Sequence, residues 1–164
     1  MKKNIFILSI LLPLAIFSSC TSSQNLNEKG NAINFTAIKR GGNSNYTKFT
    51  TVEIHNFKEL GEVWGNFYAK YDRKPPIPTI DFEKNMLIAV ALGERNAGSY
   101  SIQVKSILET KTNITIVVEE NKPGASCTTA SVMVYPFQLI EITQQNKPIT
   151  YAKTLKVNDC NKGM

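Results

Sequence analysis

An unbroken run of seven apolar residues, from Met86 to Leu92, is the feature that most constrains the fold of this chain. The run stops at Gly93, and Gly98 follows in the same turn-rich segment. Seven residues are too few for an ordinary globular helix, and a strand with one wet face would alternate in polarity. The pattern therefore predicts a central strand with both faces buried. In the turn that follows, Gly93 and Gly98 are expected to adopt conformations that bulkier residues resist.

Composition predicts one globular domain with short appendages. The chain has 164 residues, of which 42% are hydrophobic and 20% charged, and its formal net charge is +6. Without Lys2 and Lys3 the balance is 17 basic against 13 acidic residues, or +4. Beyond the N-terminus the basic residues are scattered, with adjacent pairs only at Lys39-Arg40 and Arg73-Lys74. Because no basic stripe could track phosphates, we expect no nucleic-acid partner.

The N-terminus has the form of a bacterial export signal. Lys2 and Lys3 precede an apolar stretch from Ile5 to Phe17, which is shorter than the ~20 residues of a permanent membrane-spanning helix. It ends in Ser18-Ser19-Cys20, which resembles a lipobox. That resemblance implies a signal peptide over residues 1–19 and a lipid anchor on Cys20. The alternative is a plain signal peptide with an incidental cysteine.

The predicted division of the chain continues with a polar tether over residues 20–31 and a single domain over residues 32–160. A lipid on Cys20 would hold the protein at the membrane of a bacterial cell envelope. Because no acidic stretch follows Cys20, we expect attachment to the outer membrane on the side that faces the periplasm.

Cys127 and Cys160 are the two remaining cysteines. In an exported protein an even pair favours a disulfide bond. The alternatives are two free buried thiols or a metal site. The metal alternative is weak, because the chain has one histidine and neither cysteine belongs to a closely spaced ligand pair. We therefore predict no metal and no cofactor.

One amphipathic helix is predicted over residues 56–71. Asn56 and Glu59 have the spacing of a capping box. A stripe of apolar side chains then recurs at helical spacing: Phe57, Leu60, Val63, Trp64, Phe67, Tyr68 and Tyr71. At the edge of this stripe, Gly61 and Gly65 are expected to let the helix approach a sheet closely.

The rest of the chain predicts antiparallel strands. Residues 33–38 and 46–54 are expected to form one hairpin around the turn at Arg40–Asn43, and residues 102–118 a second around Glu109–Asn113. Pro136 marks an edge, a bulge or a switch between sheets, and a last strand follows Pro148. The predicted fold is α+β and mainly antiparallel, with a twisted sheet or sandwich packed against the helix.

From residue 50 to 160 the chain resembles the PrcB family. The resemblance lies in Val90–Ile102, a following hairpin, Lys122-Pro123-Gly124, Cys127 and Tyr135-Pro136. That family is named for an accessory lipoprotein subunit of a surface serine-protease complex. Where the family has Thr-Gly-Gly-Tyr, this chain has Ala97-Gly98-Ser99-Tyr100, so only Gly98 and Tyr100 correspond. No catalytic residue is implied.

The functional hypothesis is therefore a noncatalytic envelope lipoprotein that binds or stabilises a secreted protein, with a protease as the partner that the resemblance implies. The expected contact is the loop that contains Arg95, Asn96, Gly98 and Tyr100, because a buried strand would hold it rigidly. The alternative reading is that Gly98 permits a tight hairpin and Tyr100 packs beneath it.

Other functions remain open alternatives. The loops at Asn96–Tyr100, Pro123–Ser126 and Tyr135–Phe137 are similar in kind to those of immunoglobulin-like inhibitors of cysteine peptidases. A hydrolase would have to be built around the single histidine, His55, with Cys127 or a serine as nucleophile. A small-ligand binder is the remaining possibility. No local motif supports the hydrolase, so no catalytic residue is predicted.

Overall fold

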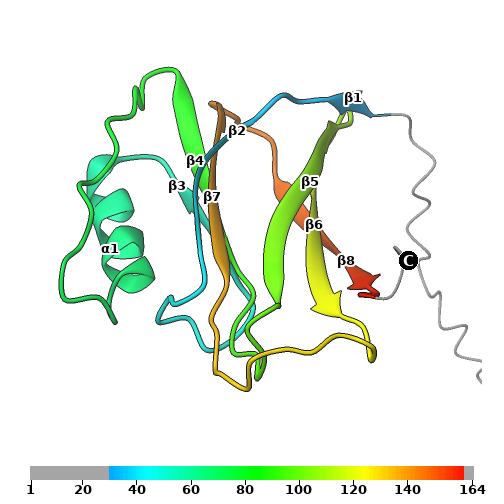
Figure 1. Ribbon diagram of the computed structural model, residues 1–164. Helices are drawn as coiled ribbons and strands as arrows, with labels where there is room; N and C mark the ends of the chain where they lie inside the picture. Colours follow the sequence, from blue (N-terminus) through cyan, green and yellow to red (C-terminus); the bar gives the residue numbers. More distant parts are fainter. Residues whose placement is uncertain (1–29, 161–164) are drawn as a thin grey trace, which may run out of the picture.

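The computed structural model describes residues 30–160, which form three layers. A helix covers one face of a four-stranded sheet, and the other face of that sheet packs on a second four-stranded sheet (Figure 1). We call the two sheets the helix-side sheet and the outer sheet. All strand pairs but one are antiparallel. The predicted α+β class is therefore confirmed.

The helix-side sheet has the order β2-β7-β4-β3, and the outer sheet the order β1-β5-β6-β8. The bounds in chain order are β1 Asn31–Ala32, β2 Thr36–Gly41, β3 Thr50–Ile54, α1 Phe57–Phe67, β4 Asn85–Ala91, β5 Ser101–Glu109, β6 Ile114–Pro123, β7 Phe137–Thr143 and β8 Ile149–Asn158.

Strand β4 is the buried strand that the apolar run predicts. Successive side chains of a strand point to opposite faces of the sheet. Accordingly, Met86, Ile88 and Val90 pack between the two sheets, and Leu87 and Ala89 pack under the helix. Each of these side chains is at most 2% exposed. Because β4 has an apolar layer on both sides, neither of its faces needs polar residues.

Helix α1 begins as predicted and ends earlier. Asn56 is the N-cap and accepts a hydrogen bond from the backbone N–H of Glu59 at 3.0 Å. The helix ends at Phe67, where the prediction extended to Tyr71. The backbone N–H of Tyr71 instead donates to the carbonyl of Tyr68, which closes a turn. The stripe is buried from Leu60 to Tyr68, whereas Phe57 and Tyr71 at its ends are exposed.

The predicted role of Gly61 and Gly65 is wrong. A Cβ atom added at either position would have no neighbour within 4 Å. Neither glycine is therefore a point of close approach between the helix and the sheet.

The predicted hairpin between the first strands is also wrong. Strand β2 pairs with β7, and β3 pairs with β4, so β2 and β3 lie at opposite edges of the helix-side sheet. The physical reason is burial: β4 and β7 are buried on both faces and take the two central positions. The half-exposed strands β2 and β3 are left for the edges.

The outer sheet contains the second predicted hairpin, formed by β5 and β6. Strand β8 then lies parallel to β6. Between β6 and β8 the chain leaves the outer sheet and adds β7 to the helix-side sheet. Pro136 directly precedes β7, so of its three predicted roles the switch between sheets is correct.

The predicted signal peptide, Cys20 and most of the tether lie outside the described residues. Asn31, in β1, pairs with Glu109 of β5. Within residues 30–160, no helix has the length and hydrophobicity that crossing a bilayer requires.

Candidate protein-binding surface

Three connections meet at one end of the sandwich. They are residues 42–49 between β2 and β3, residues 92–100 between β4 and β5, and residues 124–136 between β6 and β7 (Figure 1). Arg95 and Val134 exchange backbone hydrogen bonds of 2.9 and 2.8 Å, which tie the second connection to the third. All the loops that the sequence singled out for recognition therefore lie at the same end.

Gly93 is conformationally required at the start of the 92–100 connection, and Gly98 is not. Gly93 has φ +84°, and a Cβ there would lie 2.7 Å from the backbone carbon of Lys48. Gly98 has no positive φ, and its Cβ would lie 3.4 Å from Val132 Cγ2, an ordinary contact. The prediction for Gly93 is confirmed and that for Gly98 is wrong.

The side chain of Arg95 is partly buried and is held by contacts within the molecule. Its Nε and Nη2 atoms donate to the two carboxylate oxygens of Glu120, at 2.8 and 3.1 Å, and Nη1 donates to the carbonyl of Glu94 at 2.7 Å. Its charge also lies 5.9 Å from the centre of the Tyr100 ring. This bidentate geometry is that of a strong, oriented ion pair. The planar donor group that was expected to face a partner thus holds the loop to β6.

Glu120, near the end of β6, is the carboxylate that accepts these hydrogen bonds. Only 7% of the residue is exposed, and Lys153 of β8 also reaches it, with Nζ 2.6 Å from Oε2. The hydrogen bonds from Arg95 hold the pKa of Glu120 below its ordinary value, against the opposing effect of burial, and Lys153 adds to the lowering. The carboxylate is therefore ionised at neutral pH and joins three segments of the chain.

The other predicted contact residues divide into exposed and partly buried positions. Asn96 and Gly98 are exposed. Tyr100 is partly buried and packs against the core between the sheets. Tyr100 therefore makes packing contacts within the domain, and Asn96 lies at the surface.

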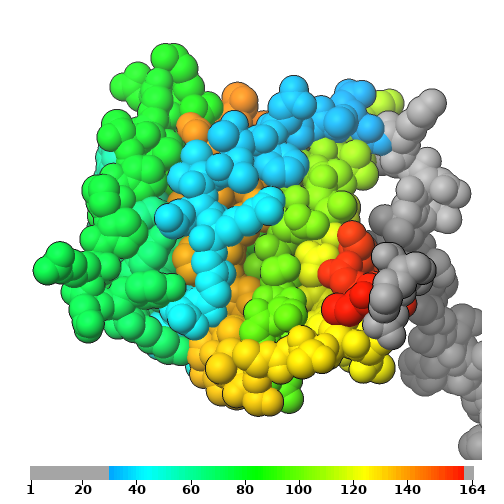
Figure 2. Space-filling model, in the orientation of Figure 1, coloured from blue at the N-terminus to red at the C-terminus, as the bar shows by residue number. Residues whose placement is uncertain are grey.

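Val132 and Met133 are surface residues that sequence reasoning missed. Their exposed fractions are 49% and 48%, and they lie beside the 92–100 connection, because the N–H of Gly98 donates to the carbonyl of Ala130. In Figure 2 this part of the chain runs along the lower margin of the molecule in yellow and orange. Two adjacent apolar side chains on an anchored loop are typical of a binding contact. The run Val132-Met133-Val134 within this loop is the available sequence signal.

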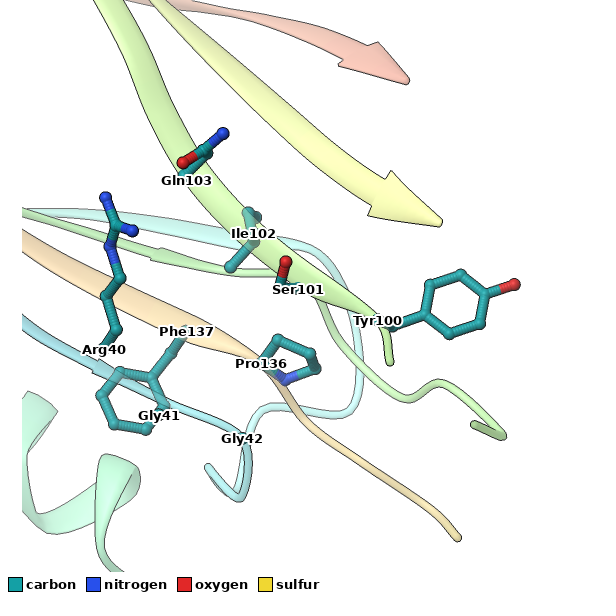
Figure 3. A pocket seen from close by; sticks show the side chains of 9 residues that line it. All are labelled: Arg40, Gly41, Gly42, Tyr100, Ser101, Ile102, Gln103, Pro136 and Phe137. Atoms are coloured by element: carbon teal, nitrogen blue, oxygen red, sulfur yellow. The ribbon is translucent and has the colours of Figure 1, made fainter. Parts of the chain in front are cut away.

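A shallow depression of about 320 Å³ lies beside these loops, between β2 and the start of β5 (Figure 3). Arg40, Gln103 and Phe137 line it, and the ring of Tyr100 points away from Phe137 with its hydroxyl outward (Figure 3). The amide of Gln103 already donates to Glu119. The other polar side chains of the lining are those of Arg40, Ser101 and Tyr100.

Cys127 and Cys160 are joined by a disulfide bond in the structure, with Cα atoms 5.0 Å apart. The bond ties the 124–136 connection to the end of β8. The N–H of Gly124 also donates to the carbonyl of Asn158 at 2.9 Å. The loop end of the sandwich is therefore anchored to the outer sheet by a covalent bond as well as by hydrogen bonds.

His55 and Cys127, the residues that a hydrolase would use, contact different groups. His55 is 4.0 Å from Glu53 and 3.2 Å from the amide of Gln144, while the sulfur of Cys127 belongs to the disulfide. A disulfide sulfur is not a thiolate nucleophile. Within residues 30–160, no three His, Cys, Asp or Glu side chains are grouped so as to hold a metal ion.

Among known proteins, one family model matches the central part of the chain. Residues 86–143 match the family model described as PrcB C-terminal. The match is shorter than the resemblance drawn from the sequence. It spans β4 to β7 and includes the connections at residues 92–100 and 124–136. No curated protein and no solved structure matches the chain. Over residues 86–143 this chain is thus similar to the PrcB C-terminal family, as its loop pattern predicted.

Proposed function

We propose that this protein is a noncatalytic accessory subunit that binds a secreted protease complex in the bacterial cell envelope. The observation that carries the proposal is the family match over residues 86–143, because the family is named for a subunit of such a complex. Cys20 would carry the lipid that keeps the domain at the membrane, on the side of the outer membrane that faces the periplasm.

The geometry supports a contact through the connections at residues 92–100 and 124–136. Asn96, Val132 and Met133 are exposed on loops that hydrogen bonds and the disulfide hold in place. A rigid loop loses little conformational freedom when it binds. The contact that we propose is therefore centred on Val132 and Met133, with Asn96 beside them, and Arg95 supports it from below.

Affinity capture tests this proposal. The full chain with a C-terminal tag should retain a stoichiometric protein with peptidase activity from an envelope extract. Replacing Val132 and Met133 by serine should reduce capture about tenfold or more, the effect of losing a central apolar contact. Ile77→Ser is the matched control, because Ile77 is an equally exposed aliphatic residue, at 47%, in a different segment. Capture of no stoichiometric partner, or of a partner without peptidase activity, would contradict the proposal.

The lipid anchor has its own test. Cys20→Ser should leave the protein in the aqueous phase of a detergent partition, whereas the native protein should enter the detergent phase, because several acyl chains give stable anchoring. Cys127→Ser is the control, since it removes a cysteine without touching the anchor. Unchanged partitioning of the Cys20 variant would show that the anchor is wrong, and protease treatment of whole cells would test the orientation.

A further inference from the structure

Strand β8 ends the outer sheet with an open edge. It pairs with β6 over its whole length, from Ile149 to Asn158, without a register shift, and within residues 30–160 no strand pairs with its other side. The other edge strands are less suited to pairing: β1 has two residues, β3 has five, and β2 contains a bulge. A long regular edge presents unpaired backbone N–H and C=O groups that can bind another strand.

The side chains of β8 favour such pairing on one face. Leu155 and Val157 are 60% and 53% exposed, on the same face as Tyr151, which packs between the sheets. Strand β3, the nearest edge of the helix-side sheet in Figure 1, is half as long as β8. The outer half of β8 therefore leaves an apolar strip beyond the sandwich, which side chains of an added strand could cover.

On the other face of β8, Lys156 favours acidic side chains in a strand that pairs with this edge. Lys156 is exposed and has no ion pair with any residue in the described part of the chain. Lys153 lies on the face of Leu155 and Val157, and it is already paired with Glu120. A strand beside β8 would bring its own side chains opposite those of β8, where an acidic residue is favourable and a basic one unfavourable.

A second copy of the chain satisfies these conditions poorly. In the antiparallel register that sets Leu155 opposite Leu155 of the other copy, Lys156 stands opposite Thr154. The two Lys156 side chains are then diagonal neighbours on one face. Without Lys2 and Lys3 the chain still carries a net charge of +4, so two copies repel.

We infer that the free edge of β8 binds an extended segment of the partner protein in which apolar and acidic residues alternate. The apolar residues cover Leu155 and Val157, the acidic residues face Lys156, and the backbone pairs with β8. The disulfide at Cys160 and the pairing of Lys153 with Glu120 keep this edge in place for binding. This inference rests on the proposed binding of a protein partner and adds the form of the bound segment.

Peptide binding to the full chain tests the inference directly. The probe is a ten-residue peptide that alternates valine and glutamate, and the control alternates valine and lysine. Titration should show binding of the first peptide and at least tenfold weaker binding of the second. Hydrogen exchange should slow at residues 149–158 when the first peptide binds. Binding of neither peptide, or equal binding of both, would overturn the inference.

Backbone methylation of the peptide separates strand addition from simple charge attraction. Alternate N–H groups of a strand point to opposite sides. One peptide is therefore methylated at all valine nitrogens and another at all glutamate nitrogens. One of the two should lose binding while the other keeps it. Retention of binding by both would mean that no strand is added, which also overturns the inference.

Substitutions in β8 test whether the peptide binds at this strand. Leu155→Ser should weaken binding of the valine–glutamate peptide about tenfold, and Lys156→Glu about fivefold. Ile77→Ser and Lys39→Glu are the matched controls, because both positions are exposed and lie outside β8. Equal losses in the controls would overturn the assignment to β8. A chain that is dimeric in solution and becomes monomeric on Leu155→Ser would assign the edge to a second copy instead.

The two proposals fail in different ways. If the envelope extract yields no partner, the proposed function fails, whereas the peptide titration needs no partner. If a protease is captured equally by the native chain and the Leu155→Ser variant and the valine–glutamate peptide does not bind, only the inference on β8 fails.

Discussion

A single carboxylate holds together three segments that are far apart in the sequence. Glu120 accepts two hydrogen bonds from Arg95 and pairs with Lys153. Its side chain is 9% exposed, against 26% for Arg95 and 39% for Lys153. Removing the charge would leave two cations without their acceptor in a partly buried place, and that arrangement costs free energy.

We therefore expect Glu120→Gln to lower the free energy of unfolding at pH 7 by roughly 1.5–3 kcal/mol. The pKa of Glu120 is lowered in the folded state from 4.5, so its contribution is complete above about that pH. The contribution is lost as the pH falls through the folded pKa. The variant should thus approach native stability in acid, which denaturant titrations at pH 7 and pH 3 would measure.

The control for this prediction is Glu119→Gln on the neighbouring residue. The Nζ atom of Lys105 lies 3.8 Å from Oε1 of Glu119, and the Lys105 side chain is 47% exposed. Removing this ion pair should therefore lower the free energy of unfolding only slightly. Equal losses in the two variants, or a Glu120→Gln loss that is the same at pH 7 and pH 3, would contradict the assigned role of Glu120.

The two glycines of the 92–100 connection should respond differently to alanine. Gly93→Ala should destabilise the fold by about 2 kcal/mol or more, because φ is positive and the Cβ would overlap the backbone of Lys48. Gly98→Ala should change stability by less than about 0.5 kcal/mol. Thermal unfolding of both variants tests this difference, and a larger loss at Gly98 would reverse the assignment.

At the scale of single residues, the sequence indicates which residues have a structural or functional role, but not which atoms they contact. Gly93 ends an apolar run, and that position alone indicates a turn. Arg95 and Glu120 are 25 residues apart, and no local spacing links them. The sequence therefore does not reveal that the donors of Arg95 bind Glu120 and Glu94 within the fold.

At the scale of elements, burial periodicity predicts the strands and the helix better than it predicts their neighbours. The two-sided burial of β4, the cap at Asn56 and the hairpin of β5 and β6 follow from patterns within short segments. The pairing of β2 with β7 joins residues about a hundred positions apart. Such a pairing depends on which strands need burial on both faces, a property of the whole sheet.

The helix offers a simple gain in stability. Because a Cβ at Gly61 or Gly65 would meet no atom within 4 Å, replacing either by alanine should stabilise the protein by about 1 kcal/mol through helix propensity. Gly42→Ala is the control, since Gly42 is equally open and lies outside the helix. Denaturant titration measures the gain. A loss at Gly61 or Gly65 would mean that one of them contacts a neighbour.

At the scale of the whole molecule, the disulfide closes a long loop. Cys127 and Cys160 are 33 residues apart, and in the chain-entropy model the bond contributes roughly 3–4 kcal/mol. We expect Cys160→Ser to lower the melting temperature and to speed hydrogen exchange in β8 and the 124–136 connection. The double variant with Cys127→Ser should behave alike, because both lack the same bond.

Thiol labelling of the denatured, unreduced protein is the corresponding chemical test. It should find neither Cys127 nor Cys160 reactive. Labelling of both would show that the bond does not form in the native protein, and slower exchange in the Cys160 variant would contradict its role in anchoring β8.

The central place of β7 bears on when the chain can fold. Strands β2 and β4 both pair with β7, which begins at Phe137, so the helix-side sheet stays in two separate pieces until nearly the whole chain is present. Non-local pairing of this kind is slow, because loop-closure entropy must be overcome first. A polypeptide threaded through a membrane from its N-terminus would consequently lack a complete helix-side sheet, and so stay easier to unfold and pass, almost until its last strands had crossed.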